Sequence, residues 1–453
     1  MKAARAGGLL LLAGLLLGAV PVAGADPVKP AGEPDETRRA VPREETGLTG
    51  ALSLSQVLAE VLMKNPELQA FSLEVRAREA AALQAGLLPN PAFSVQAEDI
   101  TGSGDFDSFR RTQTTVQISQ PLLLGHKIER RKRAAILNRD LADWDYRARR
   151  LDVLTRAGKT FIDVLTWQEQ LALNRKLVQL AERNLEVMRL RVKAGKVSPI
   201  HEVKARVALA NTRLELTRSE NELAGARRRL ASTWAAREPR FQKLLGDLYR
   251  VEPLVEFESL QSRIENNPDL ARWATETRQR EANLAVAESR ALPNLQLQGA
   301  YRRIEEEQAN TFVVGFQVPL QLFNRNQGAI VEARLRLDKA AVERRARRLA
   351  LQTALAAAYN QLKTAHRQVT TLKNEVLPNA KVSFDAVNEG YRSGKFSLLD
   401  VLDSQRTFFQ AQSRYVETLG RYHQAALEVK RLVGEPLVPE EARLELKPEG
   451  PQP

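Results

Sequence analysis

Two carboxylates close to a glycine turn are the residues of this chain best suited to chemistry. Asp400 and Asp403 lie three residues apart on one face of a predicted helix, just after a turn at 394–397. Carboxylates that line a narrow passage favour cations and repel anions, which is the chemistry of an ion filter. The alternative is that they cap the start of the helix, where Asp is favoured, and this applies to Asp400 more than to Asp403.

The rest of the sequence offers no reaction. Cysteine is absent, which excludes disulfides, thiolate metal sites and a lipid anchor on an N-terminal cysteine. His201, His366 and His423 are each isolated on a predicted helix, where a single His is more often a surface or packing residue than a ligand. There is no nucleophile–base pair and no phosphate-binding glycine loop. We therefore predict no enzyme, no cofactor and no resident metal ion.

The composition is typical of long helices and coiled coils. Charged residues make up 27% of the chain and aromatic residues only 6%. The net charge of +13 raises nucleic-acid binding as an alternative. Lys and Arg alternate with Glu and Asp instead of forming one basic block, and no aromatic stacking platform accompanies them, so we predict no nucleic-acid partner.

The N-terminus predicts export. Lys2 and Arg5 precede an apolar run from 7 to 20, and residues 22–25 supply the small side chains of a cleavage site. We predict a cleaved signal peptide at 1–25 and a flexible leader at 26–50. A membrane anchor fits less well because the apolar run is short, and no later run is long enough for a membrane helix.

The sequence that must position Asp400 and Asp403 is duplicated. Leu88-Pro89-Asn90 returns as Leu292-Pro293-Asn294, and three more landmarks recur in the same order. These are Asn65-Pro66 and Asn267-Pro268, Pro121 and Pro319, and Gly195-Lys196 and Gly394-Lys395. Such a long period indicates two domain-sized repeats rather than a solenoid. We place them at 51–245 and 246–433, followed by an irregular tail at 434–453.

Each repeat is predicted to contain the same four parts. A helix comes first, then a β-hairpin, a very long helix, and a return helix after a glycine turn. The predicted ranges are 54–88, 91–121, 126–193 and 200–234 in repeat 1, and 260–292, 294–320, 327–392 and 398–433 in repeat 2. Sevenfold spacing in the return helices predicts coiled-coil packing. The residues with this spacing are Leu209, Leu216, Leu223 and Leu230 in the first return helix, and Val401, Phe408, Tyr415, Tyr422 and Val429 in the second.

The extended stretches alternate apolar and polar residues. Phe93 and Val95 alternate with Ser94 and Gln96, and the pattern recurs in the other three stretches. Alternation over about ten residues is typical of a transmembrane β-barrel, and the alternative is one four-stranded sheet on a soluble domain. Four strands cannot close a barrel in lipid, where an open edge leaves backbone groups unpaired. Three chains would supply twelve strands and twelve helices, so we predict a homotrimer.

This plan resembles the TolC-type outer-membrane efflux proteins. The similarity covers the mature chain and is carried by the duplicated helix–hairpin–helix plan and the stretch Ser-Gly-Lys-Phe-Ser-Leu-Leu-Asp-Val-Leu-Asp at 393–403. Three stretches look most like the CzcC branch of heavy-metal efflux channels. They are Leu88-Pro89-Asn90-Pro91 with Glu98-Asp99, Ser119-Gln120-Pro121-Leu122 with Gly125 and Lys127, and Val318-Pro319-Leu320 with Phe323-Asn324-Arg325-Asn326-Gln327-Gly328.

The resemblance implies a mainly α fold with a transmembrane β part. Three chains would form a 12-stranded barrel in the outer membrane, continued by an α-helical tunnel through the periplasm. The tunnel would meet a periplasmic membrane-fusion adaptor and an inner-membrane RND-type pump, and the cargo would be heavy-metal cations. The same channel could serve drug efflux or type I protein secretion. A periplasmic coiled-coil adaptor or strut fits less well, because such adaptors usually carry a single helical hairpin.

The resemblance also implies roles for the glycine turns. Asp400 and Asp403 would point into the narrow periplasmic end of the tunnel, and His201 and Glu202 occupy the corresponding place in repeat 1. The family can carry a latching basic residue two positions after the glycine, where this chain has Phe396, so we expect a different latch. Residues of both turns would contact the adaptor. They are Arg191, Gly195, Lys196 and Pro199, and Tyr391, Arg392, Gly394, Lys395 and Phe396.

Overall fold

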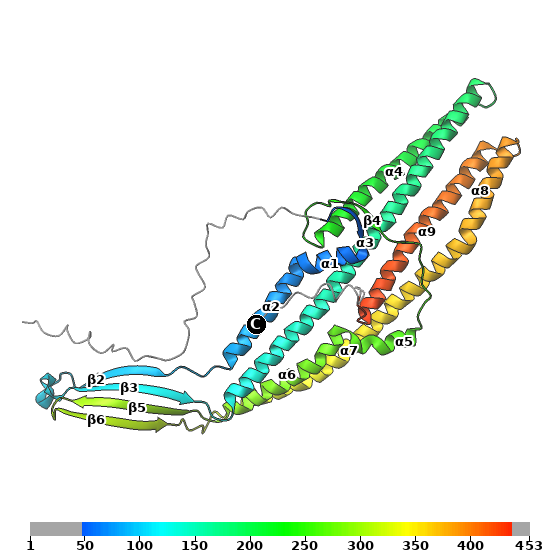
Figure 1. Cartoon of the computed structure of the whole chain (residues 1–453). Coiled ribbons are helices and arrows are strands. Elements are labelled where there is room, and N and C mark those ends of the chain that lie inside the picture. Colours follow the sequence, from blue (N-terminus) through cyan, green and yellow to red (C-terminus); the bar gives the residue numbers. More distant parts are fainter. Residues whose placement is uncertain (1–47, 437–453) are drawn as a thin grey trace, which may run out of the picture. The chain divides into compact units, whose positions relative to one another are not determined.

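The computed structural model describes residues 48–436 (Figure 1). The predicted signal peptide, most of the predicted leader and most of the predicted tail lie outside this range. The prediction of a leader up to residue 50 is wrong at its end. Gly50–Ser53 form strand β1, which pairs in parallel with β4 (Phe241–Leu245), and Leu52 is buried. This pairing joins residues far apart in sequence, so no local pattern indicates it.

The first helix of each repeat is broken where one continuous helix was predicted. Repeat 1 has α1 (Leu54–Lys64) and α2 (Pro66–Ala85). Repeat 2 has α5 (Phe257–Ser262), a 3₁₀ turn at Arg263–Asn266, and α6 (Pro268–Arg290). The break has one cause in both repeats: proline holds the preceding Asn in an extended conformation, and that Asn then caps the next helix.

The long helices form two antiparallel hairpins. α3 (Lys127–Lys193) returns as α4 (Ile200–Ser232), and α7 (Gln327–Thr371) continues into α8 (Leu377–Arg392) and returns as α9 (Leu398–Leu432). A π-helical turn at Leu372–Val376 interrupts the helix predicted at 327–392. Pro378 lacks the amide hydrogen that would continue the regular ladder, which explains the bulge.

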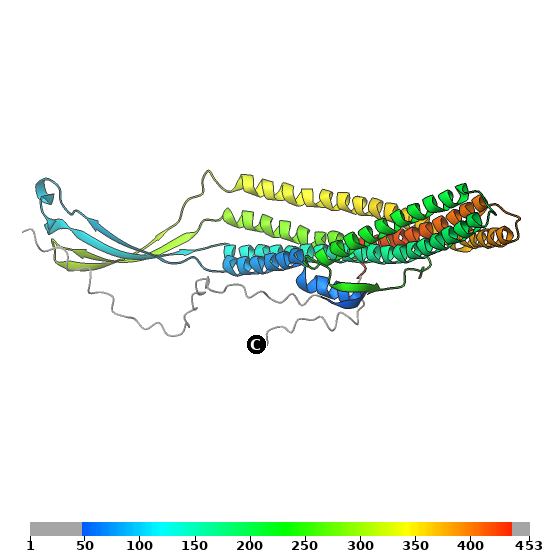
Figure 2. The same cartoon turned by 90° about the horizontal axis from the view of Figure 1, so that it is seen from above.

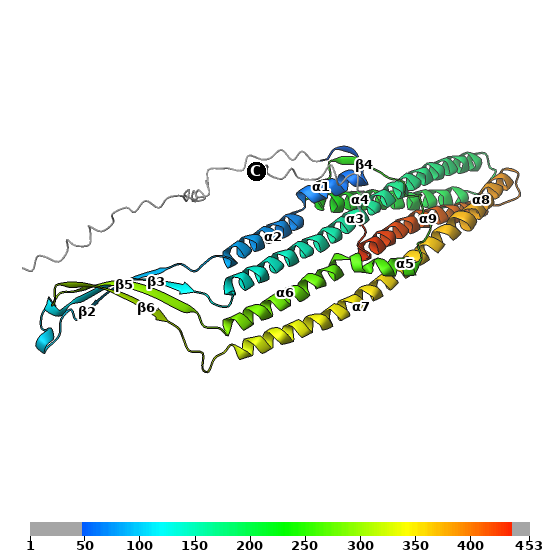
Figure 3. The same ribbon diagram turned by 60° about the horizontal axis from the view of Figure 1, so that its bottom comes forward.

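Packing within the hairpins is apolar. Leu209, Leu223 and Leu230 of the predicted heptads are buried, as are Val401, Tyr415, Tyr422 and Val429. α3 runs beside both α4 and α9, so it joins the two hairpins (Figures 2 and 3).

The seam between α3 and α9 is different, because polar side chains cross it. Four of its bonds are Asp152 to Arg431 at 2.6 Å, Lys159 to Glu428 at 2.6 Å, Gln170 to Ser413 at 2.9 Å and Asn184 to Gln405 at 2.9 Å. Glycine brings the two helices close. A Cβ on Gly420 would lie 2.5 Å from Thr166 Oγ1, and one on Gly158 would lie 3.0 Å from Leu427 Cδ1.

The four strands of the predicted hairpins form one antiparallel sheet in the order β2-β3-β5-β6. It lies at the end of the helices away from the glycine turns (Figures 1 and 3). The strands are β2 (Ala92–Glu98), β3 (Gln113–Leu122), β5 (Leu295–Ile304) and β6 (Ala309–Gln317). Short 3₁₀ turns at Gly104–Phe106 and Phe109–Arg111 lie in the β2–β3 loop.

The strand register gathers the apolar residues on one face. Val95 pairs with Val116, Val116 with Tyr301, and Tyr301 with Phe312. This face is open to its surroundings: Phe93, Phe312, Val314 and Phe316 are 70–81% exposed. The opposite face is polar and internally bonded, as in the 3.2 Å bond from Gln117 to Gln298. Among residues 48–436, no helix combines the length and apolar character needed to cross a membrane.

Candidate functional site

The two glycine turns have the same backbone construction. Gly195 and Gly394 adopt φ angles of 67° and 79°, a left-handed conformation that is strained for residues with a Cβ. Lys196 N–H then donates to Arg191 O at 2.9 Å, and Lys395 N–H to Gly390 O at 2.7 Å. These bonds satisfy the last carbonyls of α3 and α8 in a Schellman motif. The glycine turn predicted from the repeated Gly-Lys pair is therefore present in both helical hairpins.

The ends of the two hairpins contact each other through Tyr391. The Arg191 guanidinium lies 4.6 Å from the centre of its ring, and its hydroxyl donates to Met188 Sδ at 3.7 Å. The ring of Phe396 folds back against Gly390. A Cβ added at Gly390 would lie 2.3 Å from that ring. The remaining predicted contact residues, Lys196, Pro199, Arg392, Gly394 and Lys395, are exposed.

Asp400 is bonded to the start of its own helix. Its Oδ2 accepts from Ser397 N–H at 2.8 Å and from Ser397 Oγ at 2.7 Å, and its own N–H donates back to Ser397 Oγ at 3.3 Å. These hydrogen bonds to the side chain and backbone of Ser397 lower the pKa of Asp400. The capping alternative thus describes Asp400, whose carboxylate is still exposed.

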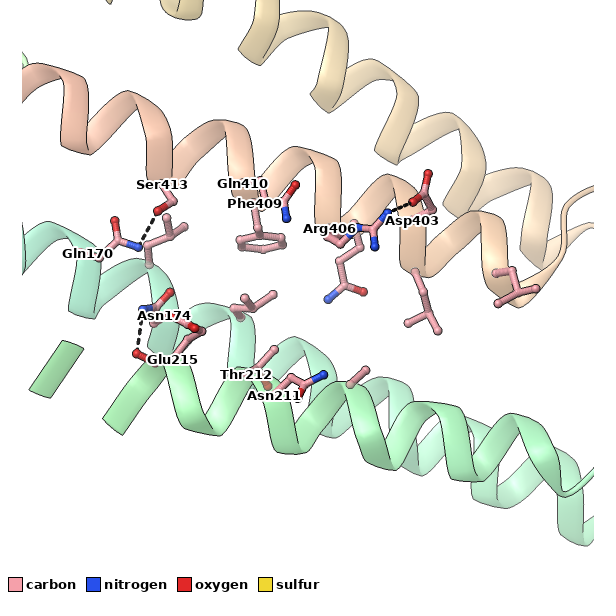
Figure 4. A pocket seen from close by; sticks show the side chains of 16 residues that line it. Gln170, Asn174, Asn211, Thr212, Glu215, Asp403, Arg406, Phe409, Gln410 and Ser413 are labelled. Carbon is pink, nitrogen blue, oxygen red and sulfur yellow. Dashed lines mark hydrogen bonds and ion pairs between the residues drawn. The ribbon is translucent and has the colours of Figure 1, made fainter. Parts of the chain in front are cut away.

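Asp403 is separate from that cap. Its carboxylate lies 2.5 Å from the Arg406 guanidinium, and its side chain is 64% exposed. It lines a cavity of about 690 Å³ between α3, α4 and α9, with Arg406 and Phe409 beside it (Figure 4). The Gln170–Ser413 bond crosses between α3 and α9 at one end of that cavity (Figure 4). The sequence placed Asp403 near the turn, but it did not reveal Arg406 as its partner.

His201 and Glu202 lie at the start of α4 and differ in role. Glu202 accepts from Arg206 at 2.8 Å and from Arg189 of α3 at 3.4 Å, so it ties the two helices of the first hairpin. The hydrogen bond and charge of Arg206, followed by those of Arg189, lower the pKa of Glu202. His201 Nδ1 is buried without a hydrogen-bond partner. No described contact joins either residue to Asp400 or Asp403.

The site has no built-in metal centre among the described residues. Between residues 48 and 436, no group of three or more His, Asp or Glu side chains is placed to hold a metal ion. The arrangement offers two exposed carboxylates after the second turn, Asp403 beside Arg406 and Asp400 beside Ser397.

The chain matches a family model described as outer membrane efflux protein. The match covers residues 57–236 and 259–435, one stretch in each repeat. The chain is 36% identical over 393 residues to the cobalt-zinc-cadmium resistance protein CzcC of Cupriavidus metallidurans, covering 87% of this chain and 92% of CzcC. It is 24% identical to the pyoverdine export outer membrane protein OpmQ of Pseudomonas putida, covering 84% and 85%.

Solved structures share the fold. The chain superposes on CusC with a TM-score of 0.70 at 15% identity, covering 84% of this chain and 92% of that one. It superposes equally well, at 0.70 and 16% identity, on the MtrE outer membrane channel of Neisseria gonorrhoeae, covering 85% and 89%. By the family match over both repeats and the identity to CzcC, the chain belongs to the outer membrane efflux protein family.

Proposed function

We propose that this outer-membrane efflux channel is the exit duct for heavy-metal cations. The ions would pass through it from an inner-membrane RND-type pump and a periplasmic membrane-fusion adaptor. The observation that carries the proposal is the 36% identity to a cobalt-zinc-cadmium resistance protein along 92% of its length. Relatives named for pyoverdine export and protease secretion are only 23–24% identical, so export of an organic molecule or a polypeptide is the second candidate.

The sheet supports a homotrimeric barrel. Channels of this family form trimers that work with adaptors and inner-membrane pumps. In this chain β2 and β6 are the edges of the four-stranded sheet, and each has a partner on one side only. An apolar face in lipid needs these edges paired. Three copies would pair all six edges and close twelve strands.

The glycine turns are proposed to be the periplasmic end. Asp403, which is 64% exposed beside Arg406, would supply a charge that favours cations, while Asp400 would hold the first turn of α9 in place. The Arg191–Tyr391 contact would hold the two hairpins together at the end of the tunnel, in place of the basic latch that Phe396 replaces. The Glu202–Arg189 bond would hold the two helices of the first hairpin. The exposed turn residues would receive the adaptor.

Replacing Asp403 by Asn is expected to reduce the preference of the channel for cations. The change removes one carboxylate per chain at the narrow end and leaves the size of the side chain unchanged. The measurement is the ratio of cation to anion permeability of single channels in planar bilayers. Asp400→Asn is a less clean test, because it also weakens the hydrogen bonds from Ser397 N–H and Ser397 Oγ that close the first turn of α9.

Glu332→Gln is the matched control for Asp403→Asn. Glu332 is similarly exposed, at 58%, and is paired with Arg336 at 2.5 Å, but it lies near the start of α7 and far along the chain from the turns. If the Asp403→Asn channel has the same conductance and selectivity as the Glu332→Gln channel, Asp403 is not part of the gate.

Deleting the gene is expected to lower the metal tolerance of the host. Without an exit duct, cations delivered by the pump would stay in the cell envelope. Growth in graded zinc, cobalt and cadmium measures the effect, and the wild-type gene on a plasmid should restore it. Unchanged metal tolerance with increased sensitivity to dyes or detergents would instead favour export of organic molecules.

A further inference from the structure

The polar face of the four-stranded sheet is almost free of charge. The register pairs Gln96 with Thr115 and Thr115 with Arg302, and every second residue along each strand belongs to the same face as these three. Its polar members are mostly amides and hydroxyls. Among the strand residues that the structure describes on this face, only Glu98 of β2 and Arg302 of β5 are charged.

The guanidinium of Arg302 is held in place without being neutralised. Its Nε donates to Thr115 Oγ1 at 3.1 Å. Between residues 48 and 436, no carboxylate forms an ion pair with it, whereas its neighbour Arg303 pairs with Glu305 at 3.3 Å. Glu98, two strands away, accepts from Gln96 Nε2 at 3.0 Å instead. Arg302 therefore presents an uncompensated positive charge in a fixed position on the polar face.

This charge lies at one end of the sheet. β5 begins just after α6 and ends at Ile304, on the side away from the helices, and Arg302 is close to that end (Figure 1). In a barrel with its apolar face in lipid, the polar face lines the interior. Arg302 would then lie inside the outer mouth, while Asp403 lies beyond the opposite end of the sheet, near the glycine turns.

We propose that Arg302 is a specificity-determining residue of the channel. Its three copies form a positive ring inside the outer end of the barrel, which repels cations and attracts anions there. The ring opposes the return of exported cations from outside. The proposal rests on the homotrimer and the cation duct proposed above, and it adds a second charged zone of the opposite sign to the passage.

The dimensions of such a barrel decide when the ring matters. Twelve strands about 4.8 Å apart and tilted by about 40° close with a backbone radius of about 12 Å. The arginine side chain extends inward from that wall, so its charge comes within one Debye length of the axis at physiological salt, where that length is about 8 Å. In 1 M salt the length falls to about 3 Å, and an ion on the axis no longer feels the ring.

Opposite charges at the two ends make the passage asymmetric. When cations move outward and anions inward, each kind of ion enters through the end that attracts it, so both accumulate in the channel and the current is large. When the direction is reversed, each ion must enter through the end that repels it, and the channel is depleted. Asp403 and Arg302 together therefore favour an outward flow of cations.

Replacing Arg302 by Gln tests the ring in planar bilayers. The ratio of cation to anion permeability at 0.1 M KCl should rise by about two- to fourfold, as expected for removing three unit charges that act across about one Debye length. In 1 M KCl the change should vanish. Arg303→Gln is the matched control, because it removes the same charge from the opposite face of the same strand, and it should change the ratio little. Arg302→Lys should keep the ratio of the natural channel.

A cysteine variant changes the charge after the channel has inserted, so a folding defect cannot imitate the result. The natural chain contains no cysteine. In Arg302→Cys, a cationic methanethiosulfonate added to the open channel should lower the permeability ratio towards its natural value, and an anionic one should raise it further. Arg303→Cys, which lies on the lipid side, should respond to neither reagent.

The outcomes separate the ring from the proposed duct. If Arg302→Gln matches Arg303→Gln and neither reagent changes the Arg302→Cys channel, the ring does not exist, even where Asp403→Asn lowers the preference for cations. If the Arg302 variants respond as expected and Asp403→Asn has no effect, the ring stands and the carboxylate gate is wrong. A protein that is monomeric in detergent and forms no conducting channel would overturn the homotrimer and the ring together.

Discussion

Replacing Asn267 by leucine is expected to lower the free energy of unfolding by about 3–5 kcal/mol, since each buried polar group that loses its partner costs about 1–3 kcal/mol. Asn267 is 2% exposed. Its Nδ2 donates to Arg431 O at 3.1 Å and Leu432 O at 3.0 Å, and its Oδ1 accepts from Asp269 N–H at 2.8 Å. Leucine fills a similar volume but cannot form these hydrogen bonds. The Arg431 and Leu432 carbonyls at the end of α9 and the Asp269 N–H at the start of α6 would then lose their side-chain partner.

The duplication supplies a replicate for this experiment. Asn65 has the same place in repeat 1, where its Nδ2 donates to Thr233 O at 2.7 Å and its Oδ1 accepts from Leu68 N–H at 3.0 Å. Asn65→Leu should therefore behave like Asn267→Leu, while Asn379→Leu, on the exposed surface of α8, should change little. Denaturant unfolding followed by helical circular dichroism gives the comparison. Equal midpoints for all three variants would show that these bonds add no stability.

The second large effect is expected from Gly420→Ala. The new methyl group would lie 2.5 Å from Thr166 Oγ1 and 3.2 Å from Thr166 Cγ2, and Thr166 is held by its bond to Ile162 O at 2.8 Å. Overpacking of this kind costs about 1–3 kcal/mol. It should outweigh the gain of up to about 1 kcal/mol that alanine brings to a helix. The variant should therefore be less stable, and α3 and α9 should be forced apart.

A second-site change identifies the cause. Thr166→Ala removes both atoms that the new methyl group meets, so Gly420→Ala/Thr166→Ala should recover most of the lost stability. Gly225→Ala is the matched control, because a Cβ there meets only the end of the flexible Arg229 side chain at 3.3 Å, and it should be neutral or stabilising. If the double variant is as unstable as Gly420→Ala alone, the loss of stability does not come from the contact with Thr166.

Periodic features of the sequence predicted the fold well. The prediction of an outer-membrane efflux channel with long helices and a four-stranded hairpin sheet is confirmed by the family match and the solved structures. The heptads at Leu209–Leu230 and the alternation at Phe312–Phe316 were readable because each separates the apolar side of an element from its polar side. Proline positions were readable for strand ends, but their effect inside the helices at Pro66 and Pro378 was missed.

The candidate site was less predictable, because its contacts join residues that are distant in sequence. Asp400 and Asp403 were both expected at the gate, with helix capping as an alternative chiefly for Asp400, and the structure separates them: Asp400 bonds to Ser397 and Asp403 to Arg406. The capping role of Asp400 was readable, since Ser397 three residues earlier is a capping-box signal. The Arg191–Tyr391 contact was not, because it depends on how α3 and α8 lie beside each other.

The short strand β1 sets an order of events for the newly exported chain. Gly50 emerges near the beginning, but its partner Phe241 follows only after both helices of the first hairpin have been translocated. Because the pairing is parallel and non-local, it is slow to form and cannot nucleate folding. The amino-terminal end of repeat 1 therefore lacks its strand partner until the chain up to Leu245 has followed it.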